Sequence, residues 1–249
     1  MSEFNCFAMS EPGANHEINE DFVAIEPGLG VFVIADGMGG RPGGAQASQL
    51  AVKAFLEQIR SLDHAALLDE KHLREAFDAA NRKIRVFAEK NRQIAGMGTT
   101  MTAVVMDGKR GKIVHVGDTR LYLFRESRLF QLTRDHTLVS ELMERNLLNA
   151  EEAEHYPLRH VLSMVLGPQE KVEADIDNLE IGIDEWLVMA TDGLSRAISK
   201  EYLTKVIKQY RTKDAKTMCR AIMSAATRNK LQDDITVAVV RIRGDKEDG

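Results

Sequence analysis

The stretch VFVIADGMGG, residues 31–40, decides the fold. Its first four residues, 31–34, are all apolar and mostly β-branched, a pattern that predicts a strand buried on both faces rather than on one. Asp36 then stands at the end of a rigid core strand. The glycines after it let the backbone turn tightly and leave room for a ligand beside its carbonyl and amide groups. The sequence therefore predicts a carboxylate mounted at the edge of the core.

Four further acidic residues have a similar setting, although they are scattered over almost the whole chain. Four of the five acids lie at or beside the end of an expected strand. Two unit charges about 4 Å apart repel by roughly 4 kcal/mol at an effective dielectric near 20, so a converging cluster would oppose folding unless cations neutralised it. Hard divalent ions such as Mg²⁺ or Mn²⁺ would remove that objection. The five residues are Glu20, Asp36, Asp118, Asp192 and Asp233.

Length and composition limit the class of protein. The 249 residues fit one large domain, and 33 basic against 38 acidic residues leave no basic excess for a nucleic-acid partner. No apolar stretch approaches the roughly 20 residues that cross a bilayer, and residues 1–10 lack the layout of a secretory signal. Cys6 and Cys219 suggest no disulfide framework. We therefore expect one cytoplasmic domain that binds neither membrane nor nucleic acid.

Periodicity along the rest of the chain predicts α+β architecture. Apolar residues recur at helical spacing over residues 47–62 and 73–87, which predicts two long amphipathic helices. Short strand-like runs joined by turns predict an antiparallel meander, so a sheet sandwich covered by helices fits better than alternating βαβ units. Further strands are expected over residues 99–106, 113–116, 121–124, 128–132, 186–190 and 235–240, and further helices over 138–147 and 218–226.

Two segments stand outside this regular pattern. Residues 149–169 contain two prolines, two histidines and mixed polarity, which predict an irregular flap. Residues 244–249 predict a frayed tail, so the single domain is expected over residues 1–243.

Converging carboxylates favour hydrolytic chemistry. Two divalent ions bridged by a carboxylate can lower the pKa of a shared water and hold phosphate oxygens for in-line attack. Mg²⁺ and Mn²⁺ prefer oxygen ligands, so a few carboxylates and a backbone carbonyl suffice where zinc would want His or Cys. The seven histidines show no metal-binding spacing such as His-Glu-x-x-His. We therefore expect Mg²⁺ or Mn²⁺ rather than zinc.

The acids belong to motifs that follow one another along nearly the entire chain. These motifs are Asn19-Glu20-Asp21, Ala35-Asp36-Gly37-Met38-Gly39-Gly40, Gly96-Met97-Gly98-Thr99-Thr100, Val116-Gly117-Asp118-Thr119-Arg120, Leu132-Thr133-Arg134-Asp135-His136, Thr191-Asp192-Gly193-Leu194-Ser195 and Asp233-Asp234-Ile235-Thr236-Val237. Together they resemble the bacterial branch of the metal-dependent protein phosphatases, the type 2C (PPM) serine/threonine phosphatases.

The resemblance implies a central antiparallel β-sandwich flanked by pairs of helices, with metals in a channel at one end. Asp36 would bridge two metal ions. Asp192 and Asp233 would complete the shell of the first ion. Glu20 and the Gly37 carbonyl would complete that of the second.

The resemblance also implies roles around these two ions. Asp118, with Asp192, would hold a possible third and weaker ion. Asp21 would lie outside the metal shell and hold a metal-bound water. Residues 149–169 would form the family's flap, which contacts substrate. Asp36 and Asp192 would act in catalysis through the bridging water.

This chain departs from the family pattern where phosphate is expected to bind. An arginine usually stands four residues before the glutamate of the first motif, and His16 stands there instead. Histidine is charged only at lower pH and cannot match the forked grip of arginine. We hypothesise that Arg41, directly after the glycine loop, or protonated His16 supplies the missing positive charge. Asp234 stands where Asn is common, and we expect it only to add negative charge.

Three other positions bear on proton transfer and nucleophilic attack. Met38 cannot donate a proton, so the leaving group would be protonated by metal-bound water or by another residue such as His136. A structural role is nevertheless favoured for His136. Ser195 is rejected as a nucleophile, because Ala197 interrupts the Gly-x-Ser-x-Gly pattern.

Residues and resemblance together predict Mg²⁺- or Mn²⁺-dependent hydrolysis of phosphoserine or phosphothreonine in proteins, with a metal-bridging hydroxide as the nucleophile. The protein is expected to be a monomer that opposes a bacterial serine/threonine kinase. Two alternatives remain open at this point. One is a catalytically weak regulator that binds phosphoproteins, and the other is a metal-dependent phosphohydrolase or nuclease acting on another substrate.

Overall fold

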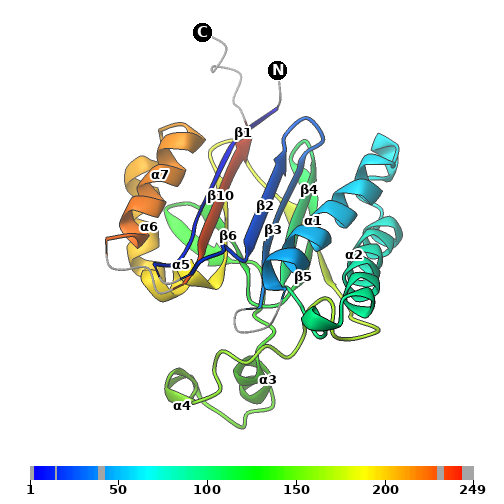
Figure 1. The fold of residues 1–249 in the computed structure, drawn as a ribbon. Coiled ribbons are helices and arrows are strands. Elements are labelled where there is room, and N and C mark those ends of the chain that lie inside the picture. Colours follow the sequence, from blue (N-terminus) through cyan, green and yellow to red (C-terminus); the bar gives the residue numbers. More distant parts are fainter. Residues whose placement is uncertain (1–2, 15, 39–42, 229–232, 243–249) are drawn as a thin grey trace.

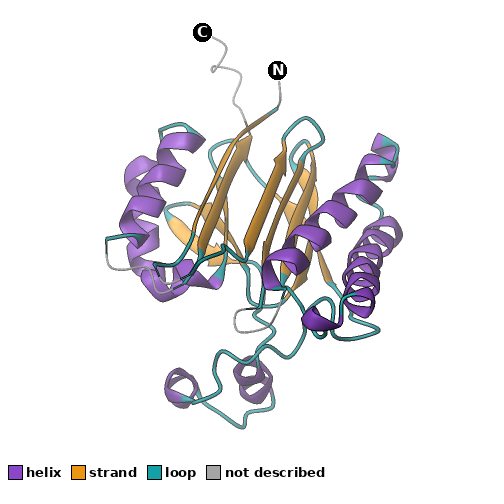
Figure 2. Cartoon of the chain, viewed as in Figure 1, coloured by secondary structure: helices purple, strands orange, loops and turns teal. Residues whose placement is uncertain are grey.

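Two five-stranded antiparallel sheets pack face to face in the computed structural model, which describes residues 3–14, 16–38, 43–228 and 233–242. Helices cover the outer face of each sheet (Figure 1). The layers therefore run helix, sheet, sheet, helix (Figure 2). This arrangement confirms the predicted α+β sandwich.

Strand β3, Val31–Asp36, shows how the sequence builds these layers. Val31 and Val33 point to one side and pack among the helices that cover this sheet. Phe32 and Ile34 point to the other side and pack between the two sheets. Successive side chains of a strand face opposite ways, so a run of buried apolar residues serves both layers at once. The prediction of a strand buried on both faces is confirmed.

The first sheet has the order β2-β3-β4-β5-β8. Every neighbouring pair is antiparallel, and in the β2–β3 register Asp21 lies opposite Asp36. The register therefore brings two acids together at one end of the sheet. The strands besides β3 are β2, Asp21–Glu26; β4, Met101–Asp107; β5, Arg110–Val116; and β8, Asp175–Glu180.

The second sheet has the order β1-β10-β9-β6-β7, and its neighbouring strands are also antiparallel. Strand β10 comes last along the described chain and lies between β1 and β9. The first and last strands are therefore neighbours in one sheet. The strands are β1, Phe4–Glu11; β6, Arg120–Arg125; β7, Arg128–Gln131; β9, Trp186–Ala190; and β10, Ile235–Ile242.

Two pairs of helices bury the outer faces of the sheets. Helices α1, Gly44–Arg60, and α2, Glu70–Lys90, cover the first sheet and confirm the two predicted amphipathic helices. Helices α6, Lys200–Tyr210, and α7, Ala215–Ala226, cover the second. No helix in the described ranges is both long and apolar enough to cross a bilayer. Three shorter elements also belong to the sandwich: α5, Asp192–Ala197, and the 3₁₀ turns His64–Ala66 and Arg92–Ile94.

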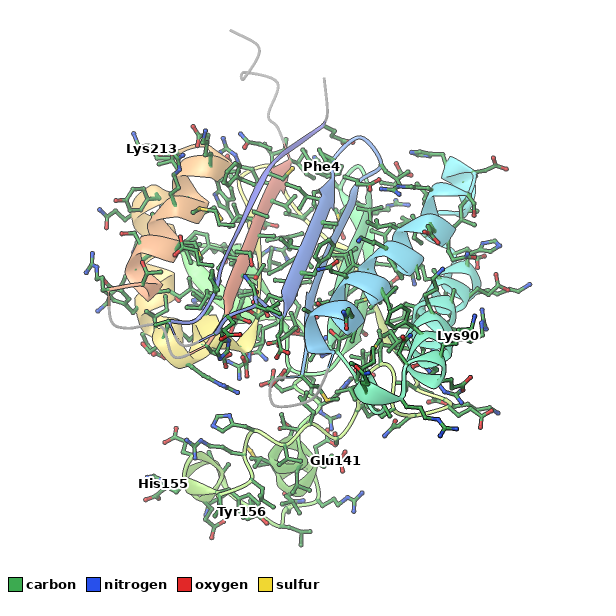
Figure 3. The ribbon with its side chains drawn as sticks, in the orientation of Figure 1. Phe4, Lys90, Glu141, His155, Tyr156 and Lys213 are labelled. Atoms are coloured by element: carbon green, nitrogen blue, oxygen red, sulfur yellow. The ribbon has the colours of Figure 1, made fainter. Side chains whose placement is uncertain are left out.

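A small helical segment projects from one end of the sandwich (Figure 1). It contains α3, Leu138–Glu144, and α4, Ala150–His155, and a β-bridge between Thr137 and Leu162 ties its base together. Figure 3 labels Glu141, His155 and Tyr156 in this segment, at the opposite end of the molecule from Phe4.

The prediction of an irregular flap over residues 149–169 is therefore wrong in part. The projecting segment includes α3, and α4 is regular because Asn149 and Glu152 form a capping box at its start. The predicted tail, residues 244–249, lies outside the described residues.

Candidate metal centre

The five predicted acids line one cavity of about 620 Å³ at the end of the sandwich. They come from loops, a strand end and the start of a helix that are far apart in the sequence. Met38 and three residues of the projecting segment also border the cavity, so the segment lies beside the acids. The lining residues are His16, Glu20, Asp36, Gly37, Met38, Thr100, Asp118, His160, Val161, Leu162, Asp192, Arg196, Asp233 and Asp234.

Asp36 is the last residue of β3, and its backbone is fixed by the next strand motif. Its N–H donates to the Thr100 hydroxyl at 3.0 Å, and its carbonyl accepts from the Thr99 hydroxyl at 2.8 Å and the Thr100 N–H at 2.9 Å. The threonines of the Gly96–Thr100 motif therefore hold the predicted bridging carboxylate in place.

Glu20 stands directly before β2 and lines the cavity. The first turn of α1 lies close to it. A Cβ on Gly44, the first residue of α1, would lie 2.6 Å from a Glu20 carboxylate oxygen. The Gly37 N–H also donates to the Glu20 carbonyl at 3.0 Å. A side chain at position 44 would therefore displace the Glu20 carboxylate. Burial and the nearby charge of Asp234 raise the pKa of Glu20.

Asp234 is buried and binds several groups of the N-terminal loop. The expectation that it only adds negative charge is therefore incomplete. Its carboxylate accepts from the Gly13 N–H at 2.8 Å, the Glu20 N–H at 2.7 Å and the His16 ring at 2.9 Å. Although burial opposes a charge on the His16 ring, Asp234 raises the pKa of that ring above its ordinary value. Asp234 thus positions Glu20 and engages His16.

Asp192 is the first residue of helix α5, and not part of an isolated turn. A Cβ on Gly193 would lie 2.0 Å from the Asp234 carbonyl oxygen, so only glycine lets the two segments approach so closely. Arg196, one helical turn further on, makes ion pairs through Nη2 with Asp192 and through Nη1 with Asp233. This guanidinium joins the two acids that the family resemblance would assign to the first metal.

Asp118 is buried in the loop between β5 and β6. Gly117 before it has φ of 101°, in the left-handed region that favours glycine. Two hydrogen bonds hold this glycine to His136, since the His136 N–H donates to the Gly117 carbonyl at 2.7 Å and the Gly117 N–H donates to Nδ1 at 3.2 Å. The favoured structural role of His136 agrees with these contacts.

Asp21 lies behind the cavity and is held by hydroxyl groups. Its Oδ2 accepts from Thr191 at 2.8 Å and from Thr236 at 2.7 Å, residues at the ends of two neighbouring strands of the other sheet. Burial raises the pKa of Asp21 to about 7, and these two hydrogen bonds act in the opposite direction. Asp21 therefore connects the two sheets at the cavity without lining it.

The acids facing the cavity carry more negative charge than their surroundings neutralise. Burial raises the pKa of Asp36 well above its ordinary value, and the charges of Asp21 and Asp192 add to this shift. Burial and Asp192 raise the pKa of Asp118 to about 7. The pKa of Asp192 is also raised, chiefly by burial, although Arg196 opposes the change. Cations bound in the cavity would relieve this repulsion.

The donor set fits Mg²⁺ or Mn²⁺, because it consists mainly of carboxylate oxygens. Among the residues that the structure describes, however, no group of three or more His, Cys, Asp or Glu residues is arranged to hold a metal ion on its own. The two acids assigned to the first metal are paired with Arg196.

The sequence predicts the acids that border the cavity, but not the side chains that pair with them. Glu20, Asp36, Gly37, Asp118, Asp192 and Asp233 all border the cavity, and their roles as ligands stay a prediction. His16 borders it too, while Arg41 lies outside the described residues. Arg196 was missed, although its spacing of four residues from Asp192 is the spacing of ion pairs on a helix.

Comparison with known proteins identifies the family. The sequence profile of the Protein phosphatase 2C family matches residues 14–237. The chain belongs to this family. Among the curated members, the serine/threonine phosphatase stp of Listeria monocytogenes is 32% identical over 214 residues, which cover 84% of this chain and 83% of that protein.

Solved structures of serine/threonine phosphatases share the fold. The Mycobacterium tuberculosis serine/threonine phosphatase PstP/Ppp superposes with a TM-score of 0.87 at 30% identity, and the match covers 97% of this chain and 99% of that one. The catalytic domain of PstP in complex with two manganese ions superposes with a TM-score of 0.84 at 29% identity, over 97% and 99% of the two chains. The predicted family, fold and hydrolase class are confirmed.

Proposed function

We propose that this chain hydrolyses phosphoserine and phosphothreonine in proteins with Mg²⁺ or Mn²⁺ bound in the acidic cavity. The observation that carries this proposal is the convergence of five carboxylates from distant segments on one cavity. Burial and mutual repulsion raise the pKa of Asp36 and its neighbours, so the site favours bound cations. Membership of the phosphatase family gives the reaction class.

The proposed ligands follow from which acids face the cavity. Asp36 would contact two ions, with Asp192 and Asp233 beside the first, and Glu20 and the Gly37 carbonyl beside the second. When bound, the ions would supply Lewis acidity and neutralise the charge of the phosphate.

Two further acids would assist from the edges of the site. Asp118 would help Asp192 to hold a third and weaker ion. Asp21 is fixed by Thr191 and Thr236 behind Asp36, where it would orient water next to the metals. The carboxylates would therefore place and orient the reacting water, and no side-chain nucleophile is needed.

The substrate is proposed to be a phosphorylated protein and not a small molecule. The projecting segment borders the cavity through Val161 and Leu162, so it would contact the polypeptide around the phosphate. A bacterial serine/threonine kinase would supply this substrate, because hydrolysis of a phosphoprotein requires an enzyme that phosphorylates it. We propose that the protein acts as a monomer in the cytoplasm.

The test compares three substrates side by side. A phosphothreonine peptide, a nucleotide and duplex DNA are each incubated with the protein in Mn²⁺ and in a chelator. We expect release of phosphate from the peptide only, and only with metal. Turnover of nucleotide or DNA in preference to peptide would favour a different phosphohydrolase. Peptide binding without turnover would favour the alternative of a catalytically weak regulator that binds phosphoproteins.

A further inference from the structure

The acidic cavity contains a cation that the family resemblance does not account for. Within the part of the chain that the structure describes, Arg196 is the only arginine or lysine lining it. The histidines that line it are His16 and His160. The side chain of Arg196 is 42% exposed, so it can reach a ligand in the cavity.

His16 is poorly placed to replace the arginine that relatives use for phosphate. Its Nδ1 is bound to the buried Asp234 at 2.9 Å. The same carboxylate accepts from two backbone N–H groups, so the ring belongs to a hydrogen-bonded loop that supports Glu20. The ring also lacks the planar fork that grips two phosphate oxygens at once.

Arg196 has the fork and the position that His16 lacks. It lies one turn after Asp192 on α5, and its two terminal nitrogens reach the carboxylates of Asp192 and Asp233. Both carboxylates face the cavity and are the proposed ligands of the first metal. Cations bound to these acids would satisfy their charge and free the guanidinium donors.

We propose that Arg196 is the residue that binds the phosphate group of the substrate, in place of the arginine that relatives carry at the position of His16. The inference rests on the proposed function and specifies how that site holds its substrate. In the structure the guanidinium pairs with Asp192 and Asp233. In the metal-loaded protein it turns to the non-bridging oxygens of the phosphomonoester, a dianion that matches its forked donors.

A simpler role for Arg196 is that of a structural counter-charge that keeps the acids in position. The two roles predict different effects on metal binding. A counter-charge that positions the ligands would weaken Mn²⁺ binding when removed. A phosphate-binding arginine that competes with the metal for Asp192 and Asp233 would leave Mn²⁺ binding as tight as before, or tighter.

The experiment uses Arg196→Ala and Arg196→Lys in the full chain. Arg125→Ala is the matched control, since Arg125 is 41% exposed and paired with Glu185 away from the cavity. Calorimetric titrations measure Mn²⁺ binding to the metal-free protein and inorganic phosphate binding to the Mn²⁺-loaded protein. Phosphopeptide kinetics then give kcat and KM separately.

For Arg196→Ala we expect the Kd of inorganic phosphate and the KM of the phosphopeptide each to rise about tenfold, with a smaller change in kcat and no loss of Mn²⁺ affinity. Arg196→Lys should fall between Ala and wild type, because it keeps the charge and loses the fork. Arg125→Ala should match wild type.

Unchanged phosphate binding in Arg196→Ala overturns the inference, and so does a weakened Mn²⁺ affinity. The phosphate titration also separates this inference from the proposed function. Should the wild type not hydrolyse phosphopeptide, the proposed function fails, yet a tenfold loss of phosphate binding in Arg196→Ala still supports the role of the arginine. Wild type that binds no phosphate with Mn²⁺ overturns it.

Discussion

Two polar clusters near the same end of the molecule differ in how their groups are satisfied. In the first, acids face a cavity, and burial and mutual repulsion raise the pKa of Asp36 and Asp118. In the second, His115 and His136 pack with ring centroids 4.8 Å apart. His115 contacts the Thr102 hydroxyl at 2.9 Å and the Arg134 carbonyl at 2.8 Å.

His136 is satisfied in the same way. Its Nδ1 accepts from the Gly117 N–H, so the proton lies on Nε2, which donates to the Asp175 carboxylate at 3.0 Å. The histidines complete their hydrogen bonds within the protein, whereas the acids leave negative charge facing a cavity. Buried polar groups with full partners hold a structure together, and those without them are candidates for binding an ion.

The largest effect that tests this contrast is expected for Asp36→Asn. The variant keeps the shape of the side chain and removes one charge from the cavity. We expect kcat/KM for a phosphopeptide to fall about a thousandfold, which is about 4 kcal/mol of barrier. Without metal, the same variant should be about 1 kcal/mol more stable to unfolding than wild type, because a buried charge and its repulsion from neighbouring acids are removed. Steady-state kinetics and denaturant melts in chelator measure the two effects.

Metal binding gives the control for Asp36→Asn. Mn²⁺ at about one hundred times its Kd should stabilise the wild type by about 2.7 kcal/mol, and the variant by much less. A structural role for Asp36 would instead make the Asp36→Asn variant less stable than wild type in chelator. That result would show that Asp36 is stabilised by its protein contacts, as the two histidines are, and does not need a bound cation.

The next effect is the pH dependence of stability that His115 causes. Its sign is opposite to that of the cavity acids, whose pKa values are raised. Burial and the neighbouring His136 lower the pKa of His115 from 6.5 to about 4. Its contribution to stability is therefore full above pH 6.5 and is lost as the pH falls toward 4, because the unfolded chain takes up the proton first. At pH 5 the loss amounts to about 2 kcal/mol.

The variant His115→Gln isolates this effect, since glutamine keeps hydrogen-bonding atoms and does not titrate. Urea melts at pH 7 and pH 5 should show that wild type loses about 2 kcal/mol more than the variant. The stability of the variant must be subtracted from that of wild type at each pH. The cavity acids have raised pKa values and therefore increase the stability of both proteins as the pH falls. Equal losses in the two proteins would contradict a neutral, buried His115.

The acids could be predicted from sequence because the same local arrangement, an acid beside the end of a strand, recurs along the chain. Asp36 ends an apolar strand before glycines, and Asp233 precedes another apolar strand. Asp234 stands directly before the same strand and Arg196 lies four residues after Asp192, but neither position reveals which residues its side chain contacts. The contacts of Asp234 with Gly13 and Glu20 join residues more than two hundred positions apart, so only the folded chain reveals them.

The strands missed by sequence reasoning share a physical cause. β1, β2 and β8 lie at the edges of their sheets, where one side of the strand has no neighbour. Edge strands are less buried and carry more polar residues, as the mostly exposed β8, Asp175–Glu180, shows. Hydrophobic patterning therefore predicted the central strands of both sheets and left these three edges unassigned.

The smallest effect is expected for Ser195. It lies one helical turn from Asp192, and its hydroxyl already has a hydrogen-bond partner within the helix. Its hydroxyl donates to the Asp192 carbonyl at 2.9 Å within α5. Ser195→Ala should change kcat/KM by about twofold or less and stability by about 0.5 to 1.5 kcal/mol. Thr204→Ala is the matched control, because Thr204 donates to the Lys200 carbonyl at 2.7 Å in α6, away from the cavity.

A hundredfold loss of activity in Ser195→Ala, without a matching loss in Thr204→Ala, would make the serine a nucleophile and overturn direct attack by water. Kinetics and melts measured together separate the possibilities, since a helix hydrogen bond affects stability in both variants. Equal behaviour of the two variants would instead place the Ser195 hydroxyl outside the chemistry. The reaction would then depend on the carboxylates that face the cavity.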